Sequence, residues 1–196
     1  MTSPDKNLDV KDGAKTNPIA TSWRGIVWEN LQVMAIALAL VLVIRTFIAE
    51  PRYIPSDSMY PTLHVGDRLV VEKFSHYFRP IQREDILVFS PPSLLQKQGY
   101  TKNQAFIKRT IATEGEKVEI HDGRVYINDT PLREDYIAEP PHYRLLPARV
   151  PDRALFMMGD NRNNSNDSHI WGFLPENQAI GRAVLRFWPP DRIGWL

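Results

Sequence analysis

The chain has 196 residues, a near-balanced charge of 24 basic against 23 acidic side chains, and no cysteine. A formal net charge of +1 gives no indication of nucleic acid as a partner, because nucleic-acid-binding domains usually carry a basic excess. The lack of cysteine excludes a disulfide framework, thiolate catalysis and cysteine-ligated zinc. The length suits one globular domain in addition to a short N-terminal segment.

The N-terminal part of the chain contains one long apolar run. Residues 1–27 are mostly polar and show no periodic apolar face, which predicts a polar tail. The run from Leu31 to Ala49 is interrupted by few polar residues, and as a helix rising ~1.5 Å per residue it approaches the ~30 Å thickness of a bilayer core. It predicts a single transmembrane helix over residues 28–49.

Two other interpretations of the apolar run are a buried helix of a soluble protein and a cleaved signal peptide. A signal peptide fits poorly, because a long polar segment precedes the run and no small-x-small cleavage site follows it. Basic residues are more frequent before the run than in residues 50–69, which favours a cytoplasmic N-terminus. Residues 50–196 are then expected on the extracytoplasmic side, periplasmic or lumenal, as a domain anchored to the lipid bilayer.

After the anchor, short β-branched and aromatic runs are separated by Gly and Pro, a pattern that predicts a mainly β domain. The predicted strands are Arg68–Phe74, Ile86–Phe89, Ala105–Thr113, Val118–His121, Arg124–Ile127, Ala154–Met158 and Ala179–Trp188.

One hairpin is especially clear in this pattern. Asp122-Gly123 lies between two alternating segments, as a tight turn between antiparallel strands requires. From there to about Val150 the chain continues as a strand-rich, proline-containing excursion. We therefore expect an inserted β subdomain over about residues 115–152.

Ser58 lies between two prolines, in the segment Pro55–Leu63. An extended chain covers at most ~3.6 Å per residue, so Ser58 lies within roughly 30 Å of chain path from the end of the anchor. A lone serine in such a loop is usually only a turn residue. The chain has no Gly-x-Ser-x-Gly elbow and no histidine in a triad setting, so a nucleophilic serine would need another base.

Lys108 is the candidate for that base. Strand alternation places Phe106, Lys108 and Thr110 on one face, and burial of that face would lower the lysine pKa and make a neutral amine available. The alternative is a solvated lysine next to Arg109 on an edge strand.

A hydrophilic loop over residues 159–172 is rich in Asp, Asn and Ser, which can satisfy their own backbone through side-chain turns. Taken alone, it indicates a surface loop. Its two acidic residues, Asp160 and Asp167, lack the spacing of a calcium-binding EF-hand, so no metal site is expected.

Four ordered blocks together strongly resemble bacterial type I signal peptidases. They are Pro-Ser-x-Ser-Met-x-Pro-Thr-Leu at 55–63, Gly-Asp-Arg-Leu-Val-Val-Glu-Lys at 66–73, Ile-Lys-Arg at 107–109, and Gly-Asp-Asn-Arg-x-Asn-Ser-x-Asp-Ser-x-x-Trp-Gly at 159–172. The resemblance implies a membrane endopeptidase with a Ser-Lys dyad that removes signal peptides from exported preproteins. It also implies a largely β catalytic core with an inserted β subdomain, and neither a cofactor nor a metal.

The resemblance assigns roles residue by residue. Ser58 becomes the nucleophile and Lys108 the general base, while Ser56 and the Ser58 backbone N–H form the oxyanion hole. Ser165 is expected to hydrogen-bond and orient Lys108, with Asp167 and Arg162 as supports of its loop. The positions matching the substrate pockets, which suit small side chains such as alanine, are Ile54, Pro55, Met59, Leu63, Phe106 and Ile107.

The chain departs from the family pattern at three positions. Asn163 stands where the family commonly has Asp, and His169 where it commonly has Arg. The family pattern therefore does not determine which residues form ion pairs around Asp167. Asp57, between the two serines, occupies a position that is often smaller, and its carboxylate is expected to change the electrostatics of the site.

Three other functions remain as alternatives: a membrane-anchored β binding module, a self-cleaving Ser-Lys repressor, and a catalytically silent relative. A repressor should carry a helix-turn-helix module and no spanning helix, which does not match this chain. A binding module would need neither Ser58 nor Lys108. A silent relative is less expected, because every proposed catalytic position holds a competent side chain.

Overall fold

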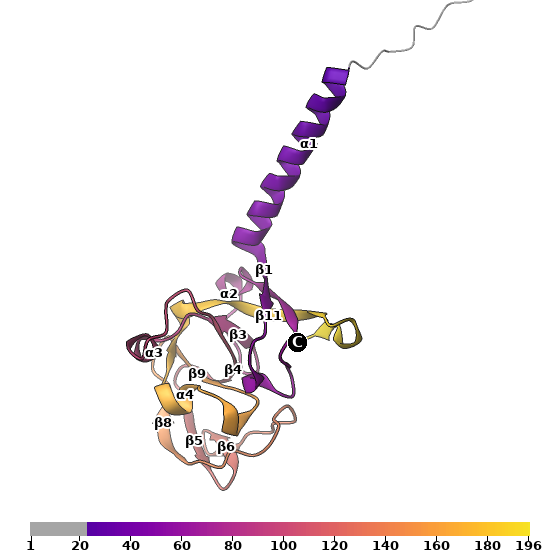
Figure 1. Ribbon diagram of the computed structural model, residues 1–196. Helices are drawn as coiled ribbons and strands as arrows, with labels where there is room; N and C mark the ends of the chain where they lie inside the picture. Colours follow the sequence, from indigo (N-terminus) through magenta and orange to yellow (C-terminus); the bar gives the residue numbers. More distant parts are fainter. Residues whose placement is uncertain (1–22) are drawn as a thin grey trace, which may run out of the picture. The chain divides into compact units, whose positions relative to one another are not determined.

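The computed structural model describes residues 23–196, so most of the predicted polar tail, residues 1–22, lies outside the described residues (Figure 1). The chain divides into two units at Leu40, and each is described by itself. Helix α1 (Trp23–Val43) continues into a π-helical segment, η1 (Ile44–Ile48).

The continuous helix covers Trp23–Ile48, 26 residues, and is long and apolar enough to cross a membrane. It includes residues 23–27, which precede the span predicted over residues 28–49. At ~1.5 Å per residue it spans roughly 39 Å, more than the ~30 Å of a hydrocarbon core.

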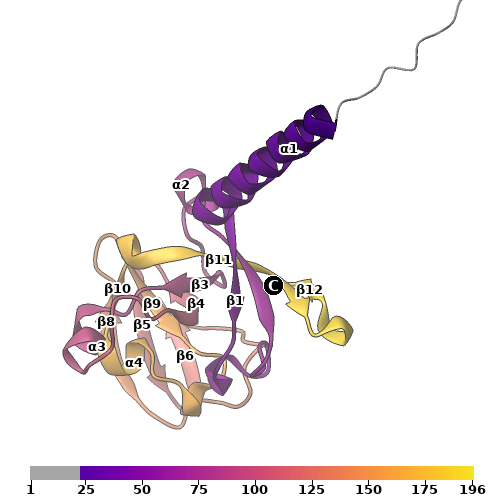
Figure 2. The ribbon, with the colours of Figure 1, turned by 45° about the horizontal axis from the view of Figure 1, so that its top comes forward.

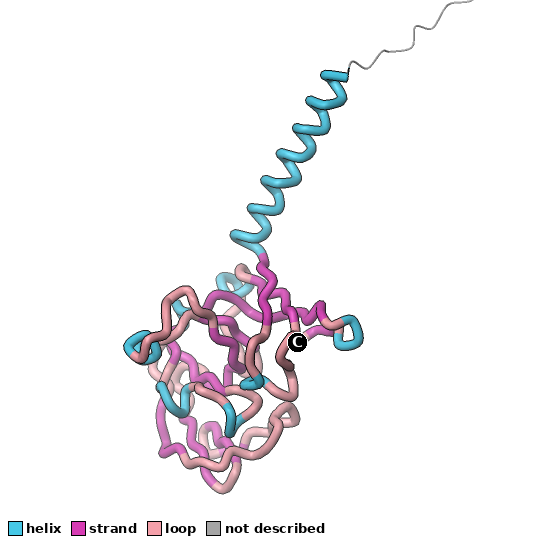
Figure 3. The backbone as a smooth tube through the Cα atoms, viewed as in Figure 1, coloured by secondary structure: helices cyan, strands magenta, loops and turns pink. Residues whose placement is uncertain are grey.

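The unit from Val41 to Leu196 is mainly β, which confirms the predicted fold class; its helices are short (Figure 3). An eight-stranded antiparallel sheet has the order β1-β2-β11-β3-β4-β9-β10, with β12 paired to β11 (Figure 2). Its strands are β1 (Ala49–Tyr53), β2 (Arg68–Glu72), β3 (Ile86–Phe89), β4 (Phe106–Ala112), β9 (Ala154–Met158), β10 (Leu174–Pro175), β11 (Ala179–Trp188) and β12 (Gly194–Trp195).

A second, four-stranded sheet has the order β7-β6-β5-β8. Its strands are β5 (Lys117–His121), β6 (Arg124–Ile127), β7 (Thr130–Pro131) and β8 (Leu145–Arg149), all within the range expected for the inserted subdomain. Asp122 and Gly123 join β5 to β6 with φ values of 49° and 71°, and positive φ at both central residues is what the tightest hairpin turns require.

The remaining elements are single turns or little more. They are α2 (Ser75–Phe78), α3 (Ser93–Lys97), α4 (Ser168–Trp171) and the 3-10 turns η2 (Asp57–Met59), η3 (Arg162–Asn164), η4 (Glu176–Gln178) and η5 (Pro190–Arg192).

Buried apolar residues link the two sheets into one body. One cluster joins Ile111 and Phe156 of the large sheet to Val118, Ile120 and Val125 of the small one. A second cluster lies under α3 and α4, and a third lies under the turn that carries Ser58. The loops between the strands are therefore fixed on a packed core.

Strand β11 carries a glycine where two strands approach closely. A Cβ atom at buried Gly181 would overlap the carbonyl oxygen of Glu72 on β2 and come within 3.0 Å of Val71 Cγ1. Only a residue without a side chain allows this spacing.

Gly181→Ala should therefore lower the unfolding free energy by about 1–3 kcal/mol, the usual range for overpacking. Thermal unfolding of the detergent-solubilised chain, followed by circular dichroism, measures this. Gly194→Ala is the matched control, because a Cβ at Gly194 would meet nothing within 4 Å. Equal unfolding temperatures for the two variants would contradict the packing argument.

Candidate active site

Ser58 lies in the 3-10 turn η2, which begins directly after the extended residue Ser56. The turn is closed by the backbone bond from Tyr60 N to Asp57 O, 3.0 Å, and continued by the bond from Leu63 N to Met59 O, 2.8 Å. Met59 and Leu63 are both fully buried in the core beneath it. These anchors hold the turn while leaving Ser58 partly accessible.

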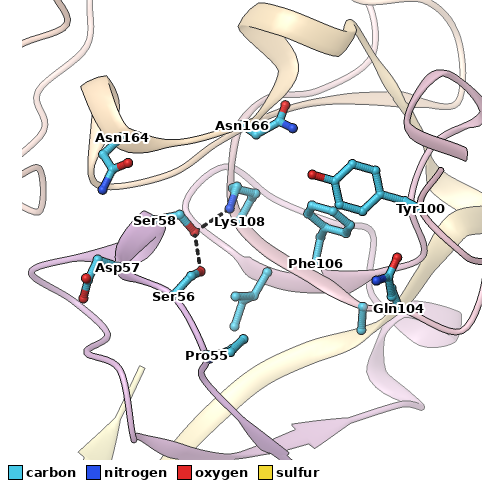
Figure 4. A pocket seen from close by; sticks show the side chains of 12 residues that line it. Pro55, Ser56, Asp57, Ser58, Tyr100, Gln104, Phe106, Lys108, Asn164 and Asn166 are labelled. Atoms are coloured by element: carbon cyan, nitrogen blue, oxygen red, sulfur yellow. Dashed lines mark hydrogen bonds between the residues drawn. The ribbon is translucent and has the colours of Figure 1, made fainter. Parts of the chain in front are cut away.

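Lys108 reaches Ser58 from strand β4, an interior strand between β3 and β9. Its side chain is 3% exposed, so the alternative of a solvated lysine on an edge strand is wrong. Lys108 Nζ donates a hydrogen bond of 2.6 Å to Ser58 Oγ (Figure 4). The expected contact between these two side chains is therefore present.

Burial lowers the pKa of Lys108 from 10.5 to about 8, because desolvation disfavours the ammonium. The negative charges of Asp167 and Asp160 oppose this effect and raise the pKa, but desolvation is the larger cause. With a pKa near 8, roughly a tenth of the amine is neutral at pH 7. A group poised in this range can act as a general base.

Asp160 is fully buried and paired with Arg109, the neighbour of Lys108 on β4. Arg109 Nε donates to one carboxylate oxygen at 2.8 Å and Nη2 to the other at 2.6 Å. Thr62 Oγ1 adds a third hydrogen bond of 2.5 Å. The pair ties the loop after β9 to strand β4 and to the segment that follows Ser58.

Asp167 is also fully buried, and it organises the other end of the loop. It accepts a 2.9 Å bond from Gly159 N and caps α4 through His169 N at 3.2 Å. The ring of His169 contacts it through Nδ1 at 2.7 Å and stacks on Tyr143 with 4.0 Å between centroids. His169 thus contacts Asp167 from the position where the family commonly has Arg.

Arg162 is buried completely and makes a bidentate ion pair with Glu134, at 2.8 and 2.6 Å. Its Nε also donates to the carbonyl of Gly159 at 3.1 Å. Arg162 therefore joins the loop after β9 to Glu134. Its partner Glu134 was not predicted, because nothing in the sequence links two residues 28 positions apart.

Ser165 differs from expectation. Its side chain is buried, but among residues 23–196 its hydroxyl has no hydrogen-bond partner, so the predicted bond to Lys108 is absent from this structure. The hydroxyl instead packs against Gly159, where an added Cβ would overlap both Ser165 Oγ and the carbonyl oxygen of Ser58. Ser165 lies next to the turn that carries Ser58.

Ser56 Oγ lies 3.5 Å from Ser58 Oγ, at the limit of a hydrogen bond. Both serines line a cavity of about 450 Å³ together with Lys108 (Figure 4). The other lining residues are Pro55, Asp57, Tyr100, Gln104, Ala105, Phe106, Ile107, Asn164 and Asn166. The cavity combines an apolar part with a small number of polar groups, as ligand sites usually do.

The predicted pocket residues divide into two groups. Pro55, Phe106 and Ile107 line the cavity. Ile54, Met59 and Leu63 are not among the lining residues: they are 2%, 0% and 0% exposed and form the core beneath the Ser58 turn. An apolar residue next to a nucleophile serves equally well as an anchor, and sequence alone cannot separate the two uses.

Five lining residues were not predicted: Tyr100, Gln104, Ala105, Asn164 and Asn166. Gln104 and Ala105 directly precede β4, and Tyr100 packs edge-on against Phe106 with centroids 5.3 Å apart. The sequence offered one signal for Ala105: it is the first residue of the predicted strand that carries Lys108. Within residues 23–196 no group of three or more Asp, Glu, His or Cys side chains could hold a metal ion.

Comparisons with known proteins agree on one family. The family model described as "Signal peptidase, peptidase S26" matches residues 27–188. The chain is 57% identical to "Probable signal peptidase I-1" of Synechocystis sp., covering 93% of this chain and 92% of that protein. It is 52% identical to "Signal peptidase I" of Leptolyngbya laminosa, covering 99% and 94%. It is also 46% identical to "Probable thylakoidal processing peptidase 2, chloroplastic" of Arabidopsis thaliana, covering 97% of this chain and 52% of that protein.

The buried pair between Arg162 and Glu134 gives a test of how the loop is supported. Glu134→Ala leaves a fully buried guanidinium without its carboxylate, which should cost about 3–5 kcal/mol of unfolding free energy. Asp135→Ala is the control, because its ion pair with Arg133 is 73% and 87% exposed and should contribute little. Chemical denaturation in detergent compares the variants, and a similar loss in both would refute a special role of the buried pair.

Proposed function

Because the chain belongs to the peptidase S26 family of signal peptidases, we propose that it removes signal peptides from exported preproteins with Ser58 as nucleophile and Lys108 as general base. The observation that carries this proposal is the 2.6 Å contact between Lys108 Nζ and Ser58 Oγ. The chain is a peptidase that acts on preproteins bearing signal peptides; the roles of individual residues are the proposal.

In the first half of the reaction, the neutral Lys108 amine takes the proton of the Ser58 hydroxyl as Oγ bonds to the carbonyl carbon of the scissile amide. The resulting tetrahedral intermediate collapses when the Lys108 ammonium returns the proton to the leaving amine. The mature protein departs with a free N-terminus, and the signal peptide stays bound to Ser58 as an ester.

In the second half, the neutral Lys108 amine takes a proton from a water molecule that attacks the ester carbon. The second tetrahedral intermediate breaks the bond to Ser58 Oγ, which recovers its proton from Lys108. The enzyme then has its starting protonation state, and the signal peptide leaves as a carboxylic acid that releases its proton to solvent.

Both intermediates carry a negative oxygen that needs hydrogen-bond donors. The Ser58 backbone N–H and the Ser56 hydroxyl are proposed for this role. The extended backbone of Ser56 and its 3.5 Å distance from Ser58 Oγ are compatible with a hydroxyl that turns toward the substrate when a carbonyl enters.

Ser165 is proposed to orient the Lys108 amine during turnover. Its buried hydroxyl has no hydrogen-bond partner among the described residues, so it can still accept a hydrogen bond. It lies against the backbone of Ser58. An ammonium has three N–H donors and needs acceptors once it is formed. Asp167 and Arg162 hold the loop that carries Ser165.

The substrate side chains that precede the cut bond are proposed to enter the part of the cavity formed by Pro55, Ala105, Phe106 and Ile107. Close apolar walls suit small side chains. No cofactor and no metal is required by this chemistry.

Helix α1 with η1 is proposed to anchor the enzyme in the lipid bilayer as one span, with residues 1–27 as the cytoplasmic tail, residues 28–49 as the core of the span, and residues 50–196 as the extracytoplasmic domain. Within this domain about residues 115–152 form the inserted subdomain. The apolar length of the helix supports the span, and the basic excess before it supports the orientation. An anchored enzyme meets a membrane-bound signal peptide at a raised effective concentration.

The dyad is tested by incubating the detergent-solubilised chain with a signal-bearing preprotein and sequencing the new N-terminus of the product. Ser58→Ala and Lys108→Ala should each lower the cleavage rate about a thousandfold or more. Lys108→Arg should be equally inactive, because a guanidinium stays protonated. Lys117→Ala, on the second sheet, should cleave normally. Full processing by folded Lys108→Ala would rule out the proposed base.

The pH profile is a separate test. Lys108 has a pKa of about 8, so lowering the pH below 8 converts the neutral base to ammonium. The value of kcat/KM should fall about tenfold per pH unit below this point and level off above it. The unfolding temperature, measured at each pH, separates loss of base from loss of fold. A flat profile between pH 8 and pH 5 would contradict a neutral lysine.

A further inference from the structure

Asp57 brings an unpaired negative charge to the wall of the cavity. Of the residues that line the cavity, only Asp57 and Lys108 carry a charge at neutral pH. The Asp57 side chain is exposed, and within residues 23–196 its carboxylate makes no hydrogen bond or ion pair. The charge is therefore directed to solvent or to a bound substrate.

The backbone of Asp57 is fixed even though its side chain is free. Its carbonyl oxygen accepts hydrogen bonds from Tyr60 N at 3.0 Å and from Asn161 Nδ2 at 3.1 Å. The second bond joins the turn η2 to the loop that follows β9. The backbone of Asp57 thus has a fixed place beside the nucleophile, and the exposed carboxylate extends from it.

Figure 4 shows where that place is. Phe106, Tyr100 and Gln104 lie on one side of Ser58, and Asp57 lies on the opposite side, near Asn164. If the apolar side receives the residues before the cut, the chain must pass Asp57 after the cut, because the scissile carbonyl lies at Ser58. This step depends on the proposed function.

We propose that Asp57 selects the charge of the first residue of the mature protein: it favours a basic residue directly after the cut and disfavours an acidic one. The chemistry is a single exposed carboxylate facing a side chain that is held beside it during attack. We expect the effect in this chain because Asp57, the residue between Ser56 and Ser58, carries a carboxylate.

The expected size follows from the exposure of the group. Exposed charge pairs have small effects, and both attraction to Lys and repulsion of Glu contribute. The ratio of kcat/KM for the two substrates should be about three- to tenfold at low ionic strength. Added salt should reduce the ratio, because the Debye length falls to roughly 3 Å at 1 M.

The experiment uses two preproteins that differ only in the first residue after the cut, Lys or Glu. The detergent-solubilised full chain cleaves each at low substrate concentration, so that the initial rate gives kcat/KM. Asp57→Asn should bring the Lys-to-Glu ratio close to one, Asp57→Glu should preserve it, and Asp57→Lys should invert it. Asp152→Asn removes an exposed carboxylate outside the cavity and should leave the ratio at the wild-type value.

Each outcome decides the inference. A ratio near one for the wild type, or the same ratio in Asp57→Asn as in the wild type, overturns it. If the wild type cleaves neither substrate, the proposed function itself is wrong, and the inference falls with it. If Asp57→Asn does not fold, the ratio in Asp57→Lys decides: an inverted preference supports the inference and an unchanged one refutes it.

Discussion

The structure of the site depends on one constraint: the amine of Lys108 must touch the hydroxyl of Ser58 in surroundings that disfavour its positive charge. The contact is 2.6 Å, and the lysine is 3% exposed. Lys108 is buried because its strand, β4, lies between β3 and β9 in the sheet. Ser58 is held within reach of Lys108 because Met59 and Leu63 anchor the turn η2 to the core. Met59 and Leu63 therefore contribute to the site by packing.

Two buried carboxylates lie close enough to Lys108 to raise its pKa, and the site has to limit their effect. Asp160 receives both nitrogens of the Arg109 fork, and Asp167 receives the Gly159 amide and the His169 ring. Because these acids have partners of their own, they do not form an ion pair with the lysine. Desolvation then remains the larger influence on its pKa.

Sequence patterns predicted the strands well where side chains alternate or form compact apolar runs, as in Ile86–Phe89 and Arg124–Ile127, which match β3 and β6 in full. They missed β8, because Pro147 lies within it, and β1, because its first residue ends the apolar run. Within the site, the proposed catalytic pair of Ser58 and Lys108 follows from the motif order. The division of Met59 and Phe106 into core and cavity does not, because both are apolar and only the fold decides which face is covered.

The segment 134–143, outside all four motifs, explains the two departures in the loop that follows β9. It is joined to that loop by the Glu134–Arg162 pair and by the bond from Ala138 N to Asp160 O. Asn163 donates to Glu139 Oε1 at 2.8 Å and accepts from His142 N at 2.8 Å. An amide can do both, whereas an ionised aspartate there would have no donor and would repel Glu139.

The same reasoning applies to His169. A flat imidazole can contact Asp167 through Nδ1 while its face stacks on Tyr143, with ring planes 14° apart. Tyr143 belongs to the segment 134–143, so the histidine connects this segment to the buried carboxylate of Asp167. Asn163 and His169 are thus matched to partners from the segment 134–143. The conformation of the loop 159–172 beside Lys108 therefore depends on these contacts as well as on its own motif residues.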